Sequence, residues 1–176
     1  MSGTFLYFAY GSNLLAKRIR LSNPTAVAKD IGCIKNFRLD FHRHSKRWQG
    51  TSATIVETEN SVVWGVVWEL DKCNLATLDR QEGVHDNIYR AMPVNVETPS
   101  GKTLNCRVYQ QCNNPEEYVK PEDYSMDKRP SPLYISTILK GAEENSLPAD
   151  YIKFLKTIPH NEYEGEYGIG LSLTEN

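Results

Sequence analysis

The sequence predicts an α+β fold built on a strongly curved antiparallel sheet or barrel. Three observations predict it: segments with strand patterns dominate the middle of the chain, two segments with helical spacing follow them, and no internal repeat is apparent. The 176 residues, 40% hydrophobic and 24% charged, have the length and composition of one globular domain. We therefore expect residues 1–176 to fold as a single domain.

The N-terminal segment predicts a strand, a tight turn and a helix. The aromatic run at residues 5–10 is typical of a buried strand, and it stops at Gly11, Ser12 and Asn13. Residues 14–21 have helical character and must end before the proline that follows. Because Ser and Asn side chains accept hydrogen bonds from the first free N–H groups of a helix, we expect Ser12 and Asn13 to be its capping residues.

The middle of the chain predicts further strands. Residues 26–33 and 37–41 alternate as strands do, and residues 42–50 are a basic, polar loop. Residues 52–57 and 62–70 are predicted to pair with each other. The second of these two segments is almost entirely apolar, which favours a central position in the sheet over an edge.

A helix and a hairpin are predicted next. Asp71 is expected to cap a helix that runs through Glu82, with Gly83 placed as the residue that ends it. Residues 88–98 and 102–110 flank a Pro-Ser-Gly turn, which indicates a β-hairpin.

The last third predicts irregular structure around two helices. Residues 113–130 are rich in Pro, Asp and Glu, which is typical of a long surface loop that could act as a lid. Helical spacing of Ala and Leu predicts helices at residues 132–145 and 148–158, and the glycine-containing tail at residues 164–176 is expected to be irregular.

Composition excludes several classes of function. The formal net charge of −2 provides no field that would gather nucleic acid or an anionic membrane. No apolar run approaches the roughly 20 residues of a membrane span, and the N-terminus lacks a signal-peptide pattern. The four cysteines form no Cys-x-x-Cys pair, and the one near match to an N-glycosylation acceptor, at residues 23–25, is blocked by its proline. These features favour a cytosolic protein with reduced thiols.

The first candidate site is the turn at Gly11 and Ser12. A glycine between a buried strand and a helix lets a ligand approach the backbone, where free N–H groups favour a carboxylate or a developing oxyanion. The alternative is a capped strand-to-helix turn that binds nothing, and spacing alone leaves both open.

The second candidate site is Glu82, at the C-terminal end of its helix. There the helix dipole opposes a negative charge, and burial would act in the same direction and raise the pKa of the carboxyl group. A carboxyl group of that kind serves as an acid or base near neutral pH. The alternative is a solvated glutamate before a helix-ending glycine.

Other candidates are weaker. His42 and His44 have metal-binding spacing, but basic neighbours would repel a metal, and we predict no metal site. The glycines at residues 165–170 are in the wrong order for a dinucleotide loop. Cys106 and Cys112 flank the end of a predicted strand, where a buried small hydrophobe is the usual role.

Taken in order, the motifs resemble the γ-glutamylcyclotransferases. FLYFAYGSNL at residues 5–14 is similar to that family's Tyr-Gly-Ser-Asn loop. VVWGVVW at residues 62–68, followed by LDRQEGV at residues 78–84, is similar to its central strand and its catalytic-glutamate helix. Further matches are Tyr89 and residues 130–134 and 141–148.

The resemblance implies a small mixed barrel with flanking helices, a cytosolic homodimer and no cofactor. The implied reaction converts a γ-glutamyl-amino acid to 5-oxoproline and the free amino acid in the course of glutathione turnover, with Glu82 as general acid and base. The residues implied to bind the substrate are Tyr7, Phe8, Ala9, Tyr10, Gly11, Ser12, Asn13, Tyr89 and Tyr134.

Some features depart from the family pattern, and other readings compete. The segment at residues 113–129 is longer and more charged than the family suggests, and it could alter which leaving amino acid is accepted. Related cyclotransferases act on glutathione or on γ-glutamylamines, and Ser12 and Asn13 favour the amino-acid substrate over the amines. A non-catalytic γ-glutamyl-binding protein is a further alternative, whereas net charge argues against a nucleic-acid module.

Overall fold

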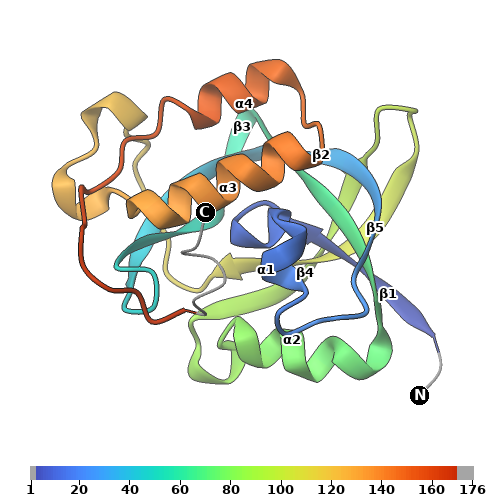
Figure 1. Cartoon of the computed structure of the whole chain (residues 1–176). Helices are drawn as coiled ribbons and strands as arrows, with labels where there is room; N and C mark the ends of the chain where they lie inside the picture. Colours follow the sequence, from blue (N-terminus) through green and yellow to red (C-terminus); the bar gives the residue numbers. More distant parts are fainter. Residues whose placement is uncertain (1–2, 170–176) are drawn as a thin grey trace.

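A computed structural model describes residues 3–169, in which five strands close into a barrel with helices on its outside (Figure 1). The strands are β1 (Thr4–Ala9), β2 (Val27–Ser45), β3 (Gly50–Asp71), β4 (Tyr89–Glu97) and β5 (Thr103–Gln111). The α-helices are α1 (Ala16–Ile19), α2 (Leu75–Gln81), α3 (Pro132–Glu144) and α4 (Ala149–Leu155). One-turn 3₁₀ helices lie at Ser12–Leu14, Lys72–Asn74, Val84–Asp86, Pro121–Asp123 and Met126–Lys128.

The order of strands around the barrel is β1-β3-β2-β4-β5, and β5 returns to β1. All neighbouring pairs are antiparallel except β1 and β5, which run parallel, so the barrel is mixed. The apolar strand β3 lies between β1 and β2, which confirms its predicted central position. The predicted α+β fold on a closed barrel is therefore confirmed, and so is the predicted hairpin, formed by β4 and β5.

The prediction that residues 52–57 pair with residues 62–70 was wrong, because both belong to β3 and both pair with β2. The two shorter segments predicted before them are likewise joined in β2. Asn36 and Asn60 both adopt a φ of 66° where the register shifts, and the Asn60 N–H donates to Asn36 Oδ1 over 3.2 Å. This bulge accommodates polar residues typical of a turn without ending either strand.

Strand pairing also removes most of the predicted basic loop at residues 42–50. β2 continues to Ser45 and β3 begins at Gly50, so only residues 46–49 form the turn. The side chains of His42 and His44 nevertheless remain exposed on the outside of the strand.

The predicted N-terminal caps were wrong. In place of one helix at residues 14–21, the chain forms a 3₁₀ turn and the four-residue α1, and neither has a side-chain cap. The Asn13 side-chain amide instead donates to the Tyr7 hydroxyl, so this side chain makes a tertiary contact and does not cap the helix. Asp71 also makes no capping bond, because a 3₁₀ turn separates it from α2. The ending of α2 is as predicted: Gly83 has a φ of 69°.

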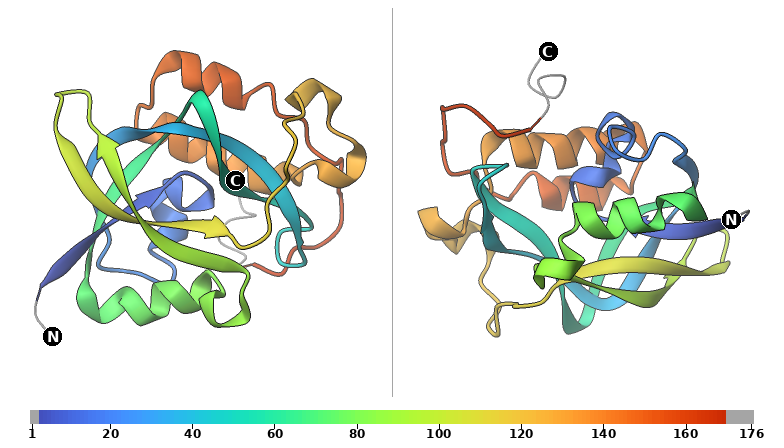
Figure 2. Two further views of the ribbon diagram at one scale, coloured as in Figure 1. Left: turned by 180° about the vertical axis from the view of Figure 1, so that it is seen from behind. Right: turned by 90° about the horizontal axis from the view of Figure 1, so that it is seen from below.

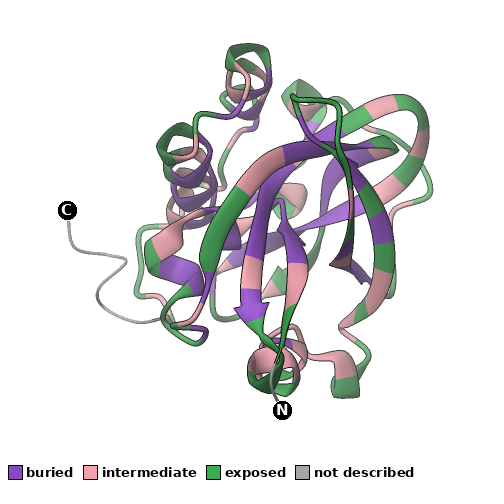
Figure 3. Cartoon of the chain, turned by 90° about the vertical axis from the view of Figure 1, so that its right-hand side faces the viewer, coloured by how far each residue is buried: buried purple, intermediate pink, exposed green. Residues whose placement is uncertain are grey.

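The helices pack on opposite sides of the barrel. α2 covers one end, and α3 and α4 lie together at the other, as the two views of Figure 2 make clear. α3 also packs closely against the turn after β1. Gly141 has no room for a side chain, because a Cβ atom there would lie 2.5 Å from the Leu15 nitrogen. Asn145 Nδ2 donates to the Leu14 carbonyl over 2.8 Å. Figure 3 shows buried positions along the strands and on the inward sides of these helices.

The segment between β5 and α3 lies against the barrel. Tyr124 is buried, and Lys128 Nζ donates to Asp40 Oδ1 and to the Phe41 carbonyl, both over 2.8 Å. Residues 164–169 contain neither helix nor strand, and the rest of the predicted tail, residues 170–176, lies outside the described residues. None of the described helices combines the length and apolar character needed to cross a membrane.

Candidate active site

A cavity of about 50 Å³ lies where the turn after β1 meets β3, the end of α2 and the start of α3. It brings together residues from across the whole chain. The lining residues are Tyr7, Tyr10, Gly11, Ser12, Asn13, Ala53, Glu82, Tyr89, Tyr109 and Tyr134. Both candidate sites of the sequence, the glycine turn and the glutamate at a helix end, therefore share one cavity.

The turn after β1 is fixed by two hydrogen bonds of Asn13. Its Nδ2 donates to the Tyr7 hydroxyl over 3.1 Å, and its carbonyl accepts from Trp68 Nε1 over 2.9 Å. Within residues 3–169, the N–H groups of Gly11, Ser12 and Asn13 donate to no acceptor. Because α1 has only four residues, these free N–H groups rather than a helix dipole make the turn suitable for an anion.

Glu82 immediately follows α2 and precedes the left-handed Gly83. The residue is partly exposed, but its carboxyl group is deep enough for burial to raise its pKa to about 7. The positive charges of Arg18 and Arg47 oppose this rise, and the negative charge of Asp79 adds to it. No other group among the described residues makes a hydrogen bond to the Glu82 carboxyl group. At neutral pH both its charged and its neutral forms are therefore populated and available to a ligand.

Two tyrosines hold the same residue of β3 at the cavity wall. The Tyr134 hydroxyl accepts from the Ala53 N–H over 2.8 Å, and the Tyr89 hydroxyl donates to the Ala53 carbonyl over 2.7 Å. Burial, and then the negative charge of Glu82, raises the pKa of Tyr89 to about 12. The phenols are thus neutral hydrogen-bonding groups at physiological pH. A Cβ atom on Gly11 would lie 3.4 Å from Tyr134 Oη, so glycine keeps this space open.

Several residues of the site carry no local signal in the sequence. Tyr109 lines the cavity from β5 and donates to Asp79, and Arg107 Nη2 donates to both carboxylate oxygens of Asp79, over 2.8 and 2.9 Å. Arg18 contributes charge from α1, within a segment predicted only as a helix. These contacts join residues far apart in the chain, so no short motif would have revealed them.

Most of the residues expected to bind substrate meet at the cavity. Phe8 and Ala9 are the two that do not line it: both lie within β1 and are completely or almost completely buried in the core. In the barrel, Ala9 is paired with Val66 of β3 and Phe8 with Val67.

The weaker candidates stay apart from the cavity. Within the described ranges, no three His, Cys, Asp or Glu side chains gather as metal ligands would. All four cysteines are free; Cys106 is buried as expected, whereas Cys112 is exposed, so its predicted burial was wrong. Gly168 donates its N–H to the Arg47 carbonyl, and Gly170 of the same motif lies beyond the described residues.

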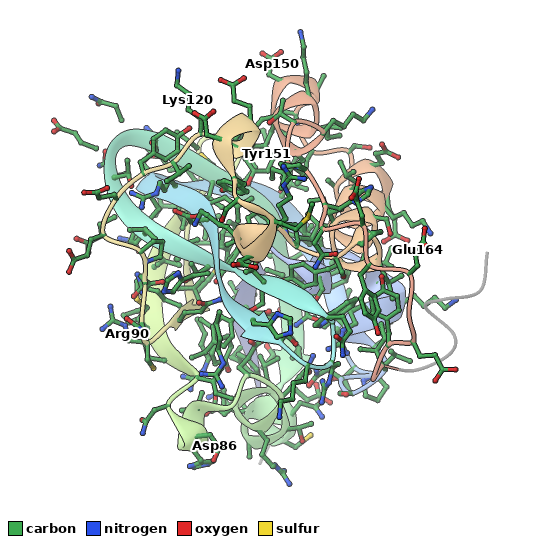
Figure 4. The ribbon with its side chains drawn as sticks, turned by 90° about the vertical axis from the view of Figure 1, so that its left-hand side faces the viewer. Asp86, Arg90, Lys120, Asp150, Tyr151 and Glu164 are labelled. Carbon is green, nitrogen blue, oxygen red and sulfur yellow. The ribbon has the colours of Figure 1, made fainter. Side chains whose placement is uncertain are left out.

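A larger groove of about 490 Å³ lies beside α4 and is mainly apolar. Tyr151 lies on its inner side, whereas the carboxylate of Asp150 points outward (Figure 4). The groove contains no buried acid or base like Glu82 among the residues that the structure describes. The smaller cavity is therefore the better candidate for chemistry.

Comparisons with known proteins show which family this chain is similar to. A profile of the AIG2-like family matches residues 62–155. The γ-glutamylcyclotransferases of Bos taurus and Homo sapiens are 45% and 42% identical over 167 residues, which cover 93% of this chain and 83% of each relative. A solved structure of a γ-glutamyl cyclotransferase has a TM-score of 0.87 at 39% identity, covering 98% of this chain and 96% of that one. These similarities confirm the resemblance found in the motifs.

A more distant structure shares the fold alone. The yeast γ-glutamyl cyclotransferase specific to glutathione is 14% identical, with a TM-score of 0.60 over 90% of this chain and 96% of its own.

Proposed function

The chain belongs to the γ-glutamylcyclotransferases, enzymes that cyclise γ-glutamyl compounds, and we propose that Glu82 is its general acid and base. We further propose that the substrates are γ-glutamyl-amino acids and the products 5-oxoproline and a free amino acid. One observation carries the assignment: a carboxyl group with a pKa raised to about 7 lies in the same cavity as a turn with free N–H groups.

The proposed reaction is an internal aminolysis. The α-nitrogen of the glutamyl group attacks its own γ-carbonyl carbon, a new C–N bond closes the ring, and the original amide C–N bond breaks. The attacking nitrogen begins as an ammonium and ends as a lactam N–H, so it loses two protons. The leaving nitrogen begins as an amide N–H and ends as an ammonium, so it gains two. The reaction therefore needs a group that moves protons between the nitrogens and consumes none.

A carboxyl group with a pKa near 7 is suited to that task. As a carboxylate Glu82 takes a proton from the ammonium, which cannot attack while protonated, and as a carboxylic acid it returns the proton to the leaving nitrogen. An ordinary glutamate, with a pKa near 4.5, would be a weaker base. The absence of hydrogen bonds to its carboxyl group within residues 3–169 leaves both oxygens free for this exchange.

The turn and Asn13 support binding of the glutamyl head group. The free N–H groups of Gly11 and Ser12 suit either the α-carboxylate or the oxyanion that forms during attack. Asn13 Oδ1 is buried and has no hydrogen-bond partner among the described residues, which suits it to accept from the α-ammonium. Tyr89 and Tyr134 line the same cavity.

Holding the chain in a folded conformation supplies much of the rate. When both reacting groups belong to one molecule and are well oriented, effective concentrations reach about 10⁵ M or more. A small cavity walled by tyrosines that are tied to Ala53 is suited to impose one folded conformation on a flexible glutamyl chain.

The test is the release of 5-oxoproline from γ-glutamyl-alanine, measured by mass spectrometry for wild type and Glu82→Gln. We expect release by wild type and near-total loss in the variant, which keeps the shape of the side chain and removes the base. Asp86→Asn, at the surface four residues away (Figure 4), is the matched control and is expected to keep full activity. Substantial turnover by Glu82→Gln would refute its assigned role.

The same assay separates the other readings. If wild type is inactive on γ-glutamyl-alanine but active on glutathione or γ-glutamyl-lysine, the substrate class is that of the related cyclotransferases. If no substrate is turned over but γ-glutamyl-alanine binds, the chain is a binding protein.

We also propose that the enzyme works as a homodimer in the cytoplasm and takes part in glutathione turnover. The family resemblance carries these proposals, and the four free thiols support a reducing compartment. Light scattering on the purified chain tests the dimer, since a monomer mass at micromolar concentration contradicts it.

A further inference from the structure

Arg18 is a buried cation without a partner. Only 7% of the residue is exposed, its Nε is sealed from solvent, and no N–H group of its side chain donates a hydrogen bond within residues 3–169. Unpaired buried charges are costly, and native proteins usually pair them. The other buried arginine, Arg38, shows the usual arrangement: it bonds Asp40 over 3.0 Å and Thr58 over 2.9 Å.

Aromatic side chains connect Arg18 to the wall of the active-site cavity. Its guanidinium carbon lies 5.6 Å from the centre of the Trp48 ring, and that ring packs edge-on against Tyr134 with 4.9 Å between centres. Tyr134 lines the cavity. Arg18 is therefore connected to the tyrosine wall through Trp48, which belongs to the β2–β3 turn at residues 46–49.

A second cation, Arg47, belongs to that turn and is exposed. Burial, and then the positive charge of Arg47, lowers the pKa of Arg18. Arg47 immediately precedes Trp48, the ring that Arg18 faces, so the two cations lie in one region, and the charges of both lower the pKa of Glu82. Neither arginine forms an ion pair with a carboxylate in the part of the chain that the structure describes. A region with two unpaired guanidinium groups favours an anionic ligand, because guanidinium binds carboxylate with two parallel hydrogen bonds.

The size of the cavity indicates which anion this is. About 50 Å³ accommodates only a few water molecules, so it has room for the glutamyl head group at most. The leaving group must then extend past the wall of the cavity. We infer that Arg18 and Arg47 bind the carboxylate of the leaving amino acid and thereby select γ-glutamyl-amino acids over γ-glutamylamines, an inference that rests on the proposed function.

A pair of substrates tests this inference directly. γ-Glutamyl-alanine and γ-glutamyl-ethylamide differ only in the carboxylate of the leaving group. We expect Arg47→Gln and Arg18→Gln to lower kcat/KM for γ-glutamyl-alanine by roughly 30-fold or more, mainly through KM, because the carboxylate of the substrate loses one of its guanidinium partners. Loss of either cation also raises the pKa of Glu82, so both substrates are compared near pH 9, where Glu82 remains a carboxylate. There, turnover of the ethylamide should change by less than about 3-fold, since it offers no carboxylate to either arginine.

Lys46→Gln is the control, because it removes a neighbouring exposed positive charge and is expected to leave kcat/KM unchanged for both substrates. Arg47 is exposed, so its variant remains informative even if Arg18→Gln does not fold. Equal losses on both substrates, or no loss on either, would overturn the inference while leaving the proposed function intact. Wild type that releases 5-oxoproline from neither substrate would overturn both.

Discussion

The indole Nε1 of Trp68 donates a hydrogen bond of 2.9 Å to the carbonyl oxygen of Asn13. The two residues are 55 positions apart, one on β3 and the other in the turn after β1. Since Asn13 also bonds Tyr7 of β1, the turn is attached to two neighbouring strands of the barrel. The positions of its free N–H groups therefore depend on the barrel and not on the short helix that follows.

Trp68→Phe is expected to weaken both stability and catalysis. The change retains a buried ring but leaves the Asn13 carbonyl without its donor, which costs about 1–3 kcal/mol. With its anchor removed, the turn loses its fixed geometry, so kcat should fall about 10-fold or more. Thermal unfolding and 5-oxoproline release measure the two effects.

Trp64→Phe provides the matched control, because Trp64 is on the same strand and lines the groove beside α4. If both tryptophan variants lose activity equally, the bond to Asn13 has no special role.

The rate should depend on pH through Glu82. Its carboxyl pKa is raised to about 7, mainly by burial, and the carboxylate is the form that accepts a proton. We expect kcat/KM to rise about tenfold per pH unit below pH 7 and to level off above it. An acidic limb centred near pH 4.5 would show that another group is the base.

Glu82 should also lower stability at high pH. The folded state holds the proton up to about pH 7 and the unfolded chain only up to about 4.5, so stability falls as pH rises between these values and is constant above them. The difference corresponds to about 3 kcal/mol. Glu82→Gln should thus be more stable than wild type by up to about that amount at pH 8, and equal to it at pH 4.

Denaturant unfolding of both proteins at the two pH values measures this difference. A variant that is less stable than wild type at pH 8 would mean that the carboxylate is stabilised in the fold, contrary to the arrangement described.

Local sequence features predicted the parts of the site that depend on few neighbours. Gly83 ends α2 in the left-handed conformation because a helix-ending glycine has a local signature, and this places Glu82 at the helix end. Long-range features escaped prediction. The bulge at Asn36 and Asn60 exists only because two long strands pair, and Tyr109 enters the cavity only because the barrel closes β5 against β1.

Asp79→Asn should move the acidic limb to lower pH. The negative charge of Asp79 helps to raise the pKa of Glu82, and removing it also leaves the positive charge of Arg107 without its partner. Both effects favour the carboxylate of Glu82. The pH profile of kcat/KM for γ-glutamyl-alanine measures the displacement, and an unchanged profile would show that Asp79 has no electrostatic effect on the base.

Gly11→Ala should reduce substrate binding without unfolding the protein. The added methyl group would lie 3.4 Å from Tyr134 Oη and 3.5 Å from the Ala53 Cβ, which are ordinary contacts that the fold tolerates. Those two residues line the cavity, however, so the methyl group occupies space that the glutamyl head group needs. We expect KM to rise by about 10- to 100-fold, the effect of forcing one extra carbon into a packed space.

Gly101→Ala should show the opposite pattern, which makes it the informative comparison. Gly101 lies in the β4–β5 hairpin at a φ of 88°, with no atom within 4 Å of an added Cβ, so alanine strains the turn there and lowers stability by about 1 kcal/mol. Its position outside the cavity leaves KM unchanged. If Gly11→Ala instead lowered the melting temperature and kept its KM, the glycine would serve the turn and not the ligand.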